Sequence, residues 1–359
     1  MTVISYFAKL SGLHINDDKS VFIPIAMAES DIPLVQSILR CPRAGFPITY
    51  LGLPLSVRRL KKIDFLPVIQ AVHERLQGWK QKFLTIAGRL VLIKAVISAL
   101  PLHFMQVIKL PTWLINQIDR VSRSFLWKGS DVCHGGHCLV NWEKCCLPKI
   151  NGGLGILHLP SQNIALLSKW LWKLQAEADS VWTKTIHNLY GTTNLQLLAE
   201  LDCTSYGLKD ALQGLHVVLA STNISDNGDS INWKWTADGA FTTKSTYMLL
   251  RDPGVCSTFQ CWIWKIHAPP KTKLFCWLLL MNRLLTQENL EKRRWPSIQH
   301  CVLCNNSDKE TTRHLFLHCA FARDLLESTI GNGLIIHQAD EVINFWDRNK
   351  TILINNSSL

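Results

Sequence analysis

The sequence predicts a mixed, mainly α-helical protein of several domains. Apolar residues recur every three to four positions through much of the chain, as in FLPVIQAVHERLQGW from Phe65, and this spacing predicts amphipathic helices. Short apolar runs separated by Gly and Pro replace that pattern before residue 57 and again after residue 230, which indicates small α+β segments there. A chain of 359 residues that is 47% hydrophobic can form packed cores in two or three domains.

The first half predicts one helix, short strands and then three helices. Residues 1–10 predict a helix that ends at a turn at Ser11 and Gly12, and HIN, SVFIPI and YLGLPL predict short strands. FLPVIQAVHERLQGW, LTIAGRLVLIKAVISAL and TWLINQIDRVSRSFLW then predict helices. Thr85 is a candidate cap for the second of these, because its side-chain oxygen can accept from a free N–H group of the first turn.

The second half predicts further helices around a loop, a linker and a strand pair. Residues 129–165 resemble a loop, and GGLG within them is expected to be a plain turn, since it lacks the Lys-Ser/Thr pair and the spacing of a phosphate loop. IALLSKWLWKLQ and TSYGLKDALQGL predict helices. STNISDNGDS predicts a linker over 221–230. INWKWTADGAFTTKSTYMLL predicts a strand pair, with DG as its turn, that runs into a helix, and PPKTKLFCWLLLMNRLLTQENLEKRR predicts a mostly helical segment.

The positive charge is concentrated in the first half. Residues 1–150 contain 19 Lys and Arg against 9 Asp and Glu, whereas the remaining 209 residues contain 19 against 18. A local excess of this size favours a polyanionic partner, because Lys and Arg release condensed counterions when they meet phosphates. A solvated basic surface without such a partner is the alternative.

Cysteine usage and hydropathy favour an intracellular protein, located in the nucleus or the cytoplasm. The N-terminus does not resemble a cleavable signal peptide, so the 12 Cys are expected to be free thiols or metal thiolates rather than disulfides. No stretch approaches the ~18–20 uninterrupted apolar residues that a membrane span needs. No membrane partner is expected, and the oligomeric state is left open.

CVLCNNSDKETTRHLFLHC is the strongest local motif. Cys301 and Cys304 form a CxxC pair, and His314 and Cys319 follow at a spacing that suits tetrahedral Zn²⁺. A short helix beginning near Thr311 would carry His314 and deliver Cys319 just beyond its last turn. Because four ligands leave no position for water, the expected zinc is structural.

Alternatives to this ligand set remain open in the sequence. His318 lies four residues after His314 and could replace Cys319, and His300 is a further nitrogen close by. Coincidental thiols are the alternative to a metal site. A second Cys- and His-rich group has no CxxC spacing and is expected to consist of packed side chains; it comprises Cys133, His134, His137, Cys138, Cys145 and Cys146.

Several motifs, taken in order, resemble the C-terminal portion of plant LINE-type non-LTR retrotransposon reverse transcriptases. They are SGLHINDDKS, YLGLPL, LTIAGRLVLIKAVISALPLHFM, FLWKG, NWEKCCLPKINGGLGI, IALLSKWLWKL and the CxxC…H…C block. GAFTTKSTY and ETTRHLFLHCAFAR resemble the zinc-binding domain of those enzymes.

The resemblance implies a domain order. A small α+β palm remnant would span 1–56, a helical thumb-like domain 57–128 and a helical connector 129–220. After the linker at 221–230, an α+β zinc-binding domain would span 231–325, followed by a tail over 326–359.

The resemblance also implies partners and site residues. Thumb helices hold a template-primer duplex of RNA or DNA, which makes Lys80, Lys82, Arg89 and Lys94 candidate phosphate contacts. The SGLHINDDKS-like segment follows the catalytic Asp-Asp hairpin in that family, so Asp17 and Asp18 are expected to be solvated acids.

A truncated, catalytically inactive product is therefore expected, one that does not hold Mg²⁺ but retains nucleic-acid binding and structural zinc. No catalytic residue is assigned to it. Two alternatives remain, namely part of an active RNA-directed DNA polymerase whose catalytic palm is missing from this chain, and a zinc-stabilised interaction module without a nucleic-acid role.

Overall fold

A computed structural model describes most of the chain and is mainly helical, as the sequence predicts. It describes residues 2–14, 16, 20–76, 83–130, 137–201, 206–224, 231–252, 254, 261–298, 300–304, 309–330 and 342–349. The chain divides into two compact units, Met1–Pro67 and Val68–Leu359. The domain limits expected from the sequence stay predictions.

The first unit contains two helices and a hairpin. Its elements are α1 (Thr2–Ser11), α2 (Ile32–Leu39), β1 (Ile48–Tyr50), β2 (Leu53–Leu55) and the 3₁₀ turn η2 (Lys62–Phe65). The predicted N-terminal helix is α1. YLGLPL forms the turn and second strand of an antiparallel hairpin, because Leu51 and Gly52 both adopt positive φ, as a tight two-residue turn requires.

One local expectation for this unit was wrong, and one helix was missed. Residues 20–25 form a single bridge, Phe22 to Arg43, rather than a strand, since Pro24 removes a backbone donor from any longer ladder. Helix α2 was not anticipated. It begins after Asp31 with Pro33 in its first turn, a position at which the missing N–H costs nothing.

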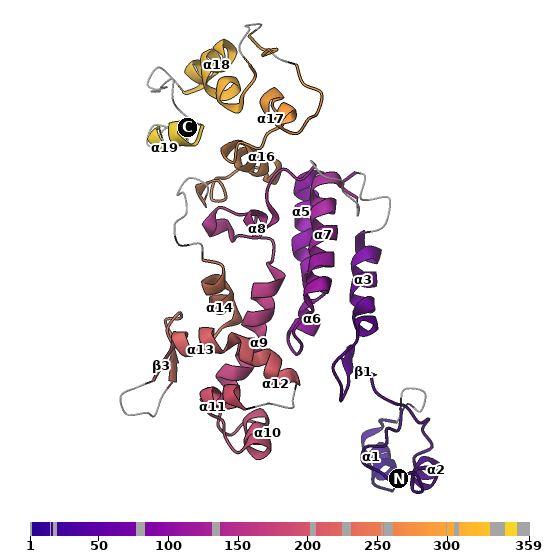
Figure 1. Cartoon of the computed structure of the whole chain (residues 1–359). Coiled ribbons are helices and arrows are strands. Elements are labelled where there is room, and N and C mark those ends of the chain that lie inside the picture. Colours follow the sequence, from indigo (N-terminus) through magenta and orange to yellow (C-terminus); the bar gives the residue numbers. More distant parts are fainter. Residues whose placement is uncertain are drawn as a thin grey trace. The chain divides into compact units, whose positions relative to one another are not determined.

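The second unit begins with a group of basic helices. These are α3 (Leu66–Leu76), whose first residues belong to the first unit, α5 (Ile86–Ala95), the 3₁₀ turn η3 (Ile97–Ala99), α6 (Leu102–Met105) and α7 (Thr112–Lys128). Helices α5 and α7 lie side by side (Figure 1). The predicted cap is confirmed, because Thr85 Oγ1 accepts from the Gly88 N–H at 3.3 Å.

The GGLG segment is a turn, as expected, and it leads into the long helix α9 (Leu159–Ala176). Before α9 come α8 (Trp142–Cys145) and the 3₁₀ turn η4 (Lys149–Asn151). Gly152 ends η4 in the left-handed conformation. A Cβ on Gly153 would lie 2.1 Å from the carbonyl oxygen of Leu147, so only glycine fits there.

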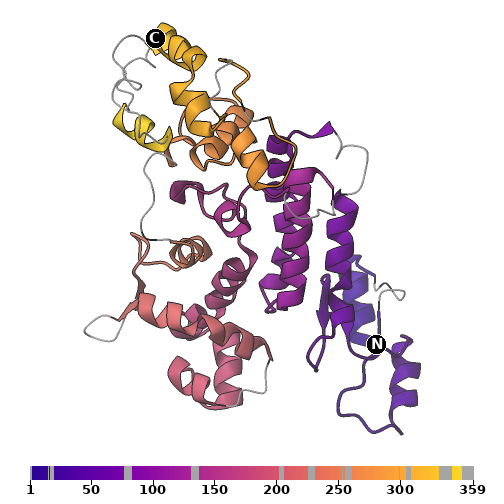
Figure 2. The ribbon, with the colours of Figure 1, turned by 45° about the horizontal axis from the view of Figure 1, so that its top comes forward.

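Short helices pack around α9. They are α10 (Val181–Tyr190), α11 (Leu195–Glu200), α12 (Tyr206–Ala211), the 3₁₀ turn η5 (Leu212–Gly214) and α13 (Leu215–Ser221). Leu171 and Leu174 of α9 form a common core with buried residues of these elements, among them Ile186, Leu198 and Val218. Figure 2 shows the same helices from a second direction.

The strand pair near residue 230 differs from the expected one. β4 (Ile231–Trp233) pairs with β3 (Thr222–Ile224), which falls within the expected linker. Ser221, the first residue of that linker, ends α13, and residues 225–230 lie outside the described residues. The segment after the DG turn does not form the second strand. Instead, Phe241 contacts Trp172 and Trp233 with ring centroids 5.8 Å and 4.9 Å apart, and this aromatic packing takes the chain into the next helix.

The remaining elements are mainly helical. They are α14 (Thr243–Leu250), α16 (Pro270–Leu280), α17 (Gln287–Lys292), a π-helical turn η6 (His314–His318), α18 (Ala320–Ile330) and α19 (Val342–Arg348). Among the described residues 231–325, β4 is the only strand, so this segment contains less strand than the expected α+β domain. None of the helices in the described ranges combines the length and apolar character that a membrane crossing needs.

Asn163 of α9 has all its amide groups hydrogen-bonded inside the protein. Its Oδ1 accepts from the Leu110 N–H at 2.7 Å, and its Nδ2 donates to the carbonyl groups of Met105 and Ile108 at 2.9 and 3.0 Å. One side chain therefore satisfies three backbone groups of the segment between α6 and α7.

Replacing Asn163 by Ala should lower the free energy of unfolding by about 3 kcal/mol or more, because each buried backbone group left without a partner costs about 1–3 kcal/mol. Urea denaturation followed by circular dichroism measures the change. Gln117→Ala, at an exposed position of α7, is the control and should change stability by no more than about 0.5 kcal/mol. Equal stability of the two variants would contradict this role of Asn163.

Candidate functional site

The four residues of the predicted zinc motif lie together. The sulfur atoms of Cys301, Cys304 and Cys319 and a ring nitrogen of His314 all lie within 4.8 Å of one another. Cys304 Sγ is 3.4 Å from His314 Nε2, and Cys301 and Cys319 are fully buried. All three cysteines are free thiols.

The donor set and its spacing fit Zn²⁺. Tetrahedral zinc with Zn–S bonds of about 2.3 Å places neighbouring sulfur atoms about 3.8 Å apart, which is compatible with the observed separations. The backbone around the CxxC pair also favours a thiolate. Burial opposes the charged form of Cys301, but the N–H groups of Cys304 and Leu303 donate to it, and the pKa of this thiol is lowered below its ordinary value.

The π-helical turn explains how two ligands five residues apart reach one point. His314 begins η6, and the Cys319 N–H donates to the His314 carbonyl at 2.7 Å. Thr311 Oγ1 accepts from the His314 N–H at 2.9 Å and so caps the start of the turn. The expected short helix near Thr311 is therefore present, and Cys319 lies just beyond its last turn, between η6 and α18.

Helix α17 anchors the chain on both sides of the CxxC pair. Gln287 Oε1 accepts from the Ile298 N–H at 2.8 Å, before the pair. After it, the backbone carbonyl of Glu310 accepts from the Glu288 N–H at 3.2 Å, and Lys309 forms an ion pair with Glu291. The loop that carries the thiols is thus held at its two ends by a single helix.

The alternative nitrogens lie outside this cluster. His318 Nε2 accepts from Arg313 Nε at 3.2 Å, and His300 is exposed. Within the part of the chain that the structure describes, one group of candidate metal ligands lies together, and it consists of Cys301, Cys304, His314 and Cys319.

The second Cys- and His-rich group does not form such a cluster among its described members. Cys145 and Cys146 are buried thiols. Burial raises the pKa of Cys145 to about 12 and that of Cys146 above its ordinary value as well. His137 lies beside Trp295, with ring centroids 5.1 Å apart. Cys133 and His134 lie outside the described residues.

Two of the four candidate phosphate contacts have partners inside the fold. Arg89 donates to the carbonyl groups of Leu84 and Leu126 at 3.1 and 3.5 Å, and Lys94 Nζ donates to the Leu154 carbonyl at 3.2 Å. Burial lowers the pKa of both side chains, and for Lys94 the nearby charge of Lys149 contributes. Both therefore have a structural role.

The other two candidate contacts, Lys80 and Lys82, lie outside the described residues, as do Asp17 and Asp18. Phosphate contact by the four basic residues stays a prediction.

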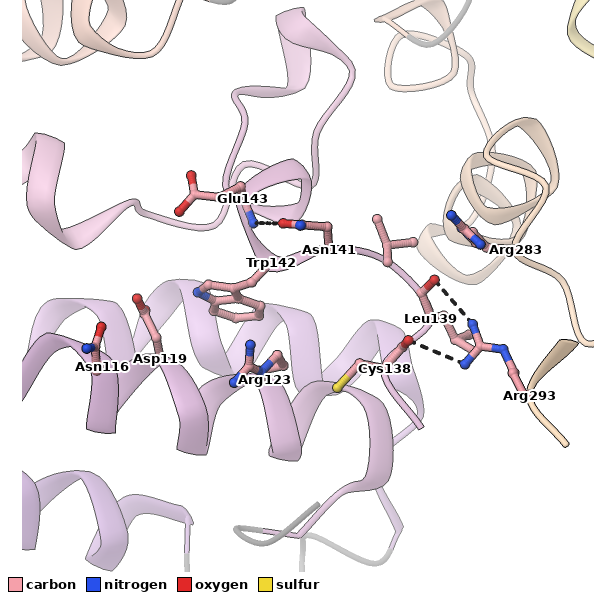
Figure 3. A pocket seen from close by; sticks show the side chains of 11 residues that line it. Asn116, Asp119, Arg123, Cys138, Leu139, Asn141, Trp142, Glu143, Arg283 and Arg293 are labelled. Atoms are coloured by element: carbon pink, nitrogen blue, oxygen red, sulfur yellow. Dashed lines mark hydrogen bonds between the residues drawn. The ribbon is translucent and has the colours of Figure 1, made fainter. Parts of the chain in front are cut away.

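A polar pocket of about 580 Å³ is a second candidate site, which the sequence did not reveal. Helix α7 contributes Asn116, Asp119 and Arg123, which share one face because they lie three and four residues apart. Arg283 and Arg293 come from more than 150 positions further along the chain (Figure 3). The sequence indicates only that three polar residues share one face of α7. It contains no local pattern that relates this face to Arg283 and Arg293.

Asp119 is half-buried in this pocket. Burial, and next the negative charge of Glu143, raise its pKa from 3.8 to about 6, against the opposing effects of Trp142 and Arg123. Folding therefore costs free energy while this carboxylate is charged. That cost is fully present above pH 6 and decreases as the pH falls from about 6 to about 4.

Comparison with known proteins gives two matches. The family described as zinc-binding in reverse transcriptase matches residues 241–325, which include the four clustered ligands. A curated protein of Arabidopsis thaliana, named putative ribonuclease H protein, is 28% identical over 351 aligned positions. The alignment covers 74% of this chain and 56% of the relative, so the chain spans little more than half of that protein's length. The matches support a retrotransposon-related protein with a reverse-transcriptase zinc-binding domain.

Metal analysis of the purified chain tests the cluster. The wild type should contain about one zinc per chain, and Cys301→Ser, Cys304→Ser and Cys319→Ser should each lose most of it, because an incomplete ligand set binds weakly. His318→Gln and Cys41→Ser, outside the cluster, are the controls and should retain the metal. Equal zinc content in all variants would refute the site. If His318→Gln lost zinc and Cys319→Ser retained it, His318 rather than Cys319 would be the fourth ligand.

Asp119→Asn should stabilise the protein in a pH-dependent way. A pKa shift of two units corresponds to about 3 kcal/mol, so the variant should exceed the wild type in free energy of unfolding by up to about 3 kcal/mol at pH 7. The difference should vanish near pH 4. Denaturation curves at several pH values measure it, with Asp324→Asn at an exposed position as the control. A pH-independent difference would show that the carboxylate charge is not its cause.

Proposed function

We propose that this chain is the nucleic-acid-binding, zinc-stabilised portion of a plant LINE-type non-LTR retrotransposon reverse transcriptase. The observation that carries the proposal is the Cys₃His cluster, because it lies inside the segment that matches the reverse-transcriptase zinc-binding family. The order of motifs from SGLHINDDKS to the CxxC block supports the assignment to LINE-type elements.

Cys301, Cys304, His314 and Cys319 would hold the zinc. When bound, the metal supplies a rigid cross-link between the CxxC loop and the η6 turn. The role is structural, because four protein ligands complete the tetrahedral shell. The chain's own bonds to α17 already hold the two ends of the CxxC loop, so metal binding would join this held loop to the η6 turn.

Nucleic acid is the proposed partner, as a template-primer duplex of RNA or DNA. The excess of Lys and Arg in residues 1–150 supports this proposal, and its candidate phosphate contacts remain Lys80, Lys82, Arg89 and Lys94. The name of the Arabidopsis relative also points to nucleic-acid chemistry, but no step of catalysis is assigned to this chain. We further propose an intracellular location, in the nucleus or the cytoplasm.

Binding to a fluorescein-labelled RNA–DNA hybrid tests the proposal. A protein that makes about six phosphate contacts loses on the order of 10³ in affinity between 50 and 200 mM salt, and a loss of about 10² or more is expected here. Lys80→Gln combined with Lys82→Gln should weaken binding and make the salt dependence shallower.

The control for that double variant is Lys244→Gln combined with Lys271→Gln, which removes the same charge from exposed positions of the second half. Absent binding, or binding that does not depend on salt, would contradict the nucleic-acid role. A primer-extension assay on the same hybrid tests the expected lack of polymerase activity, and extension by the wild-type chain alone would revive the active-polymerase alternative.

A further inference from the structure

Three segments without acidic residues meet in the second unit. Residues 75–118, 144–176 and 253–287 together contain 14 Lys and Arg and neither Asp nor Glu. The structure brings these segments together, because α5 contacts α16 (Figure 1) and Trp277 Nε1 of α16 donates to the Gly152 carbonyl at 2.7 Å. A surface formed where they meet therefore has no carboxylate of its own to neutralise its positive charge.

Two lysines from different segments converge at Gly155, which follows the GGL residues of the GGLG turn. A Cβ on Gly155 would lie 3.2 Å from Lys94 Nζ of α5 and 3.4 Å from Lys149 Cγ of η4. Gly155 has a φ of +67°, a left-handed conformation that glycine adopts without strain. Because glycine has no Cβ, the side chains of Lys94 and Lys149 can both approach this point, and they lie side by side.

The zinc-binding segment contacts this lysine pair through Trp264. Lys149 Nζ lies 5.0 Å from the centroid of the Trp264 ring, a distance at which the face of the ring attracts a cation. Lys273 Nζ of α16 donates to the Trp264 carbonyl at 3.3 Å and so fixes the turn that carries the ring. Trp264 lies within the residues that match the zinc-binding family. This segment therefore orients the ammonium group of Lys149.

Both lysines have N–H groups left for a ligand. An ammonium group has three N–H donors, and Lys94 uses one of them, to the Leu154 carbonyl at 3.2 Å. The exposed side chain of Lys149 donates no hydrogen bond to the described residues, and no described carboxylate forms an ion pair with either lysine. Burial, and next the positive charge of Lys149, lower the pKa of Lys94. An anion at this place would favour the charged form of both side chains.

A phosphate of a nucleic-acid backbone suits this lysine pair. The lysine ammonium binds phosphate as a point charge on a flexible stem, so it does not require the fixed geometry of a guanidinium group. The pair also continues the acid-free segment 75–118, which contains the candidate contacts Lys80, Lys82 and Arg89. A nucleic-acid strand presents a row of phosphates and can engage several such residues together, which a single free anion cannot do.

We propose that Lys149 and Lys94 together contact the phosphate backbone of the bound nucleic acid, at the place where α5, the GGLG turn and the zinc-binding segment meet. The proposal rests on the proposed nucleic-acid role and adds Lys149 to its candidate contacts. It also gives the zinc-binding segment a part in recognition, because Trp264 orients Lys149. Lys94 has two roles, since one N–H group holds the turn through Leu154 and the others are directed to the phosphate.

Binding of the labelled RNA–DNA hybrid to the full chain tests this contact. Lys149→Gln should weaken binding about fivefold and reduce the slope of log K against log salt by about 0.7–0.9, the value for one lost phosphate contact. Lys149→Arg retains the charge and should bind within about twofold of the wild type. Lys244→Gln removes the same charge from an exposed position of α14 and should also change the affinity by less than about twofold. Circular dichroism and zinc content verify that every variant is folded.

Lysine footprinting gives a second readout. The bound hybrid should protect Lys149 from acetylation by an N-hydroxysuccinimide ester, as measured by mass spectrometry, whereas Lys244 should react equally with and without the hybrid. Hybrid binding by the wild type with Lys149→Gln equal to Lys244→Gln, or without protection of Lys149, would overturn this proposal alone. Protection of Lys149 by inorganic phosphate but not by the hybrid would overturn it in the same way. No hybrid binding by the wild type would overturn the proposed function together with this contact.

Discussion

The close packing of α9 against its neighbours is the constraint on which the second unit depends. A Cβ on Gly214 would lie 2.1 Å from Ser168 Oγ, so η5 lies so close to α9 that only glycine fits at this position. Ser168 and Asn163 are buried polar residues of α9, and each is hydrogen-bonded to backbone groups. Because these polar groups are satisfied, α9 can be enclosed by α6, α10, α12, α13 and α14 without the cost of unpaired donors.

The start of α9 and the elements just before it connect the zinc-binding segment to the preceding helical region. Tyr247 Oη of α14 accepts from the His158 N–H at 3.1 Å, and Arg251 at the end of α14 pairs with Glu143 of α8. Further along, Trp277 Nε1 donates to the Gly152 carbonyl at 2.7 Å within the buried GGLG turn. These contacts explain how residues as distant as Asp119 and Arg293 come to line one pocket, and why the segment is not a detached module.

The zinc cluster and the polar pocket differ in how far the sequence could predict them. All four metal ligands fall within CVLCNNSDKETTRHLFLHC, so their residue types and spacing carry the prediction, and local elements bring them together. The pocket is formed by three separate regions of the chain, so its lining can be identified only in the tertiary structure. For Arg89 and Lys94, phosphate contact stays a prediction from their charge on a basic helix; the hydrogen bonds that both side chains donate to backbone carbonyl groups became visible only in the structure.

The sequence by itself determined the mainly helical class, most helix positions, the Thr85 cap, the GGLG turn and the zinc motif, because each depends on residue types and spacings within one short segment of the chain, the longest being the zinc motif over 301–319. Only the tertiary structure decided the pairing of β4 with β3 and the π turn that brings His314 and Cys319 close together in space. It also decided the hydrogen-bond partners of Arg89 and Lys94 and the lining of the pocket. Those features depend on which distant groups satisfy a buried donor or charge, and local periodicity contains no information about that choice.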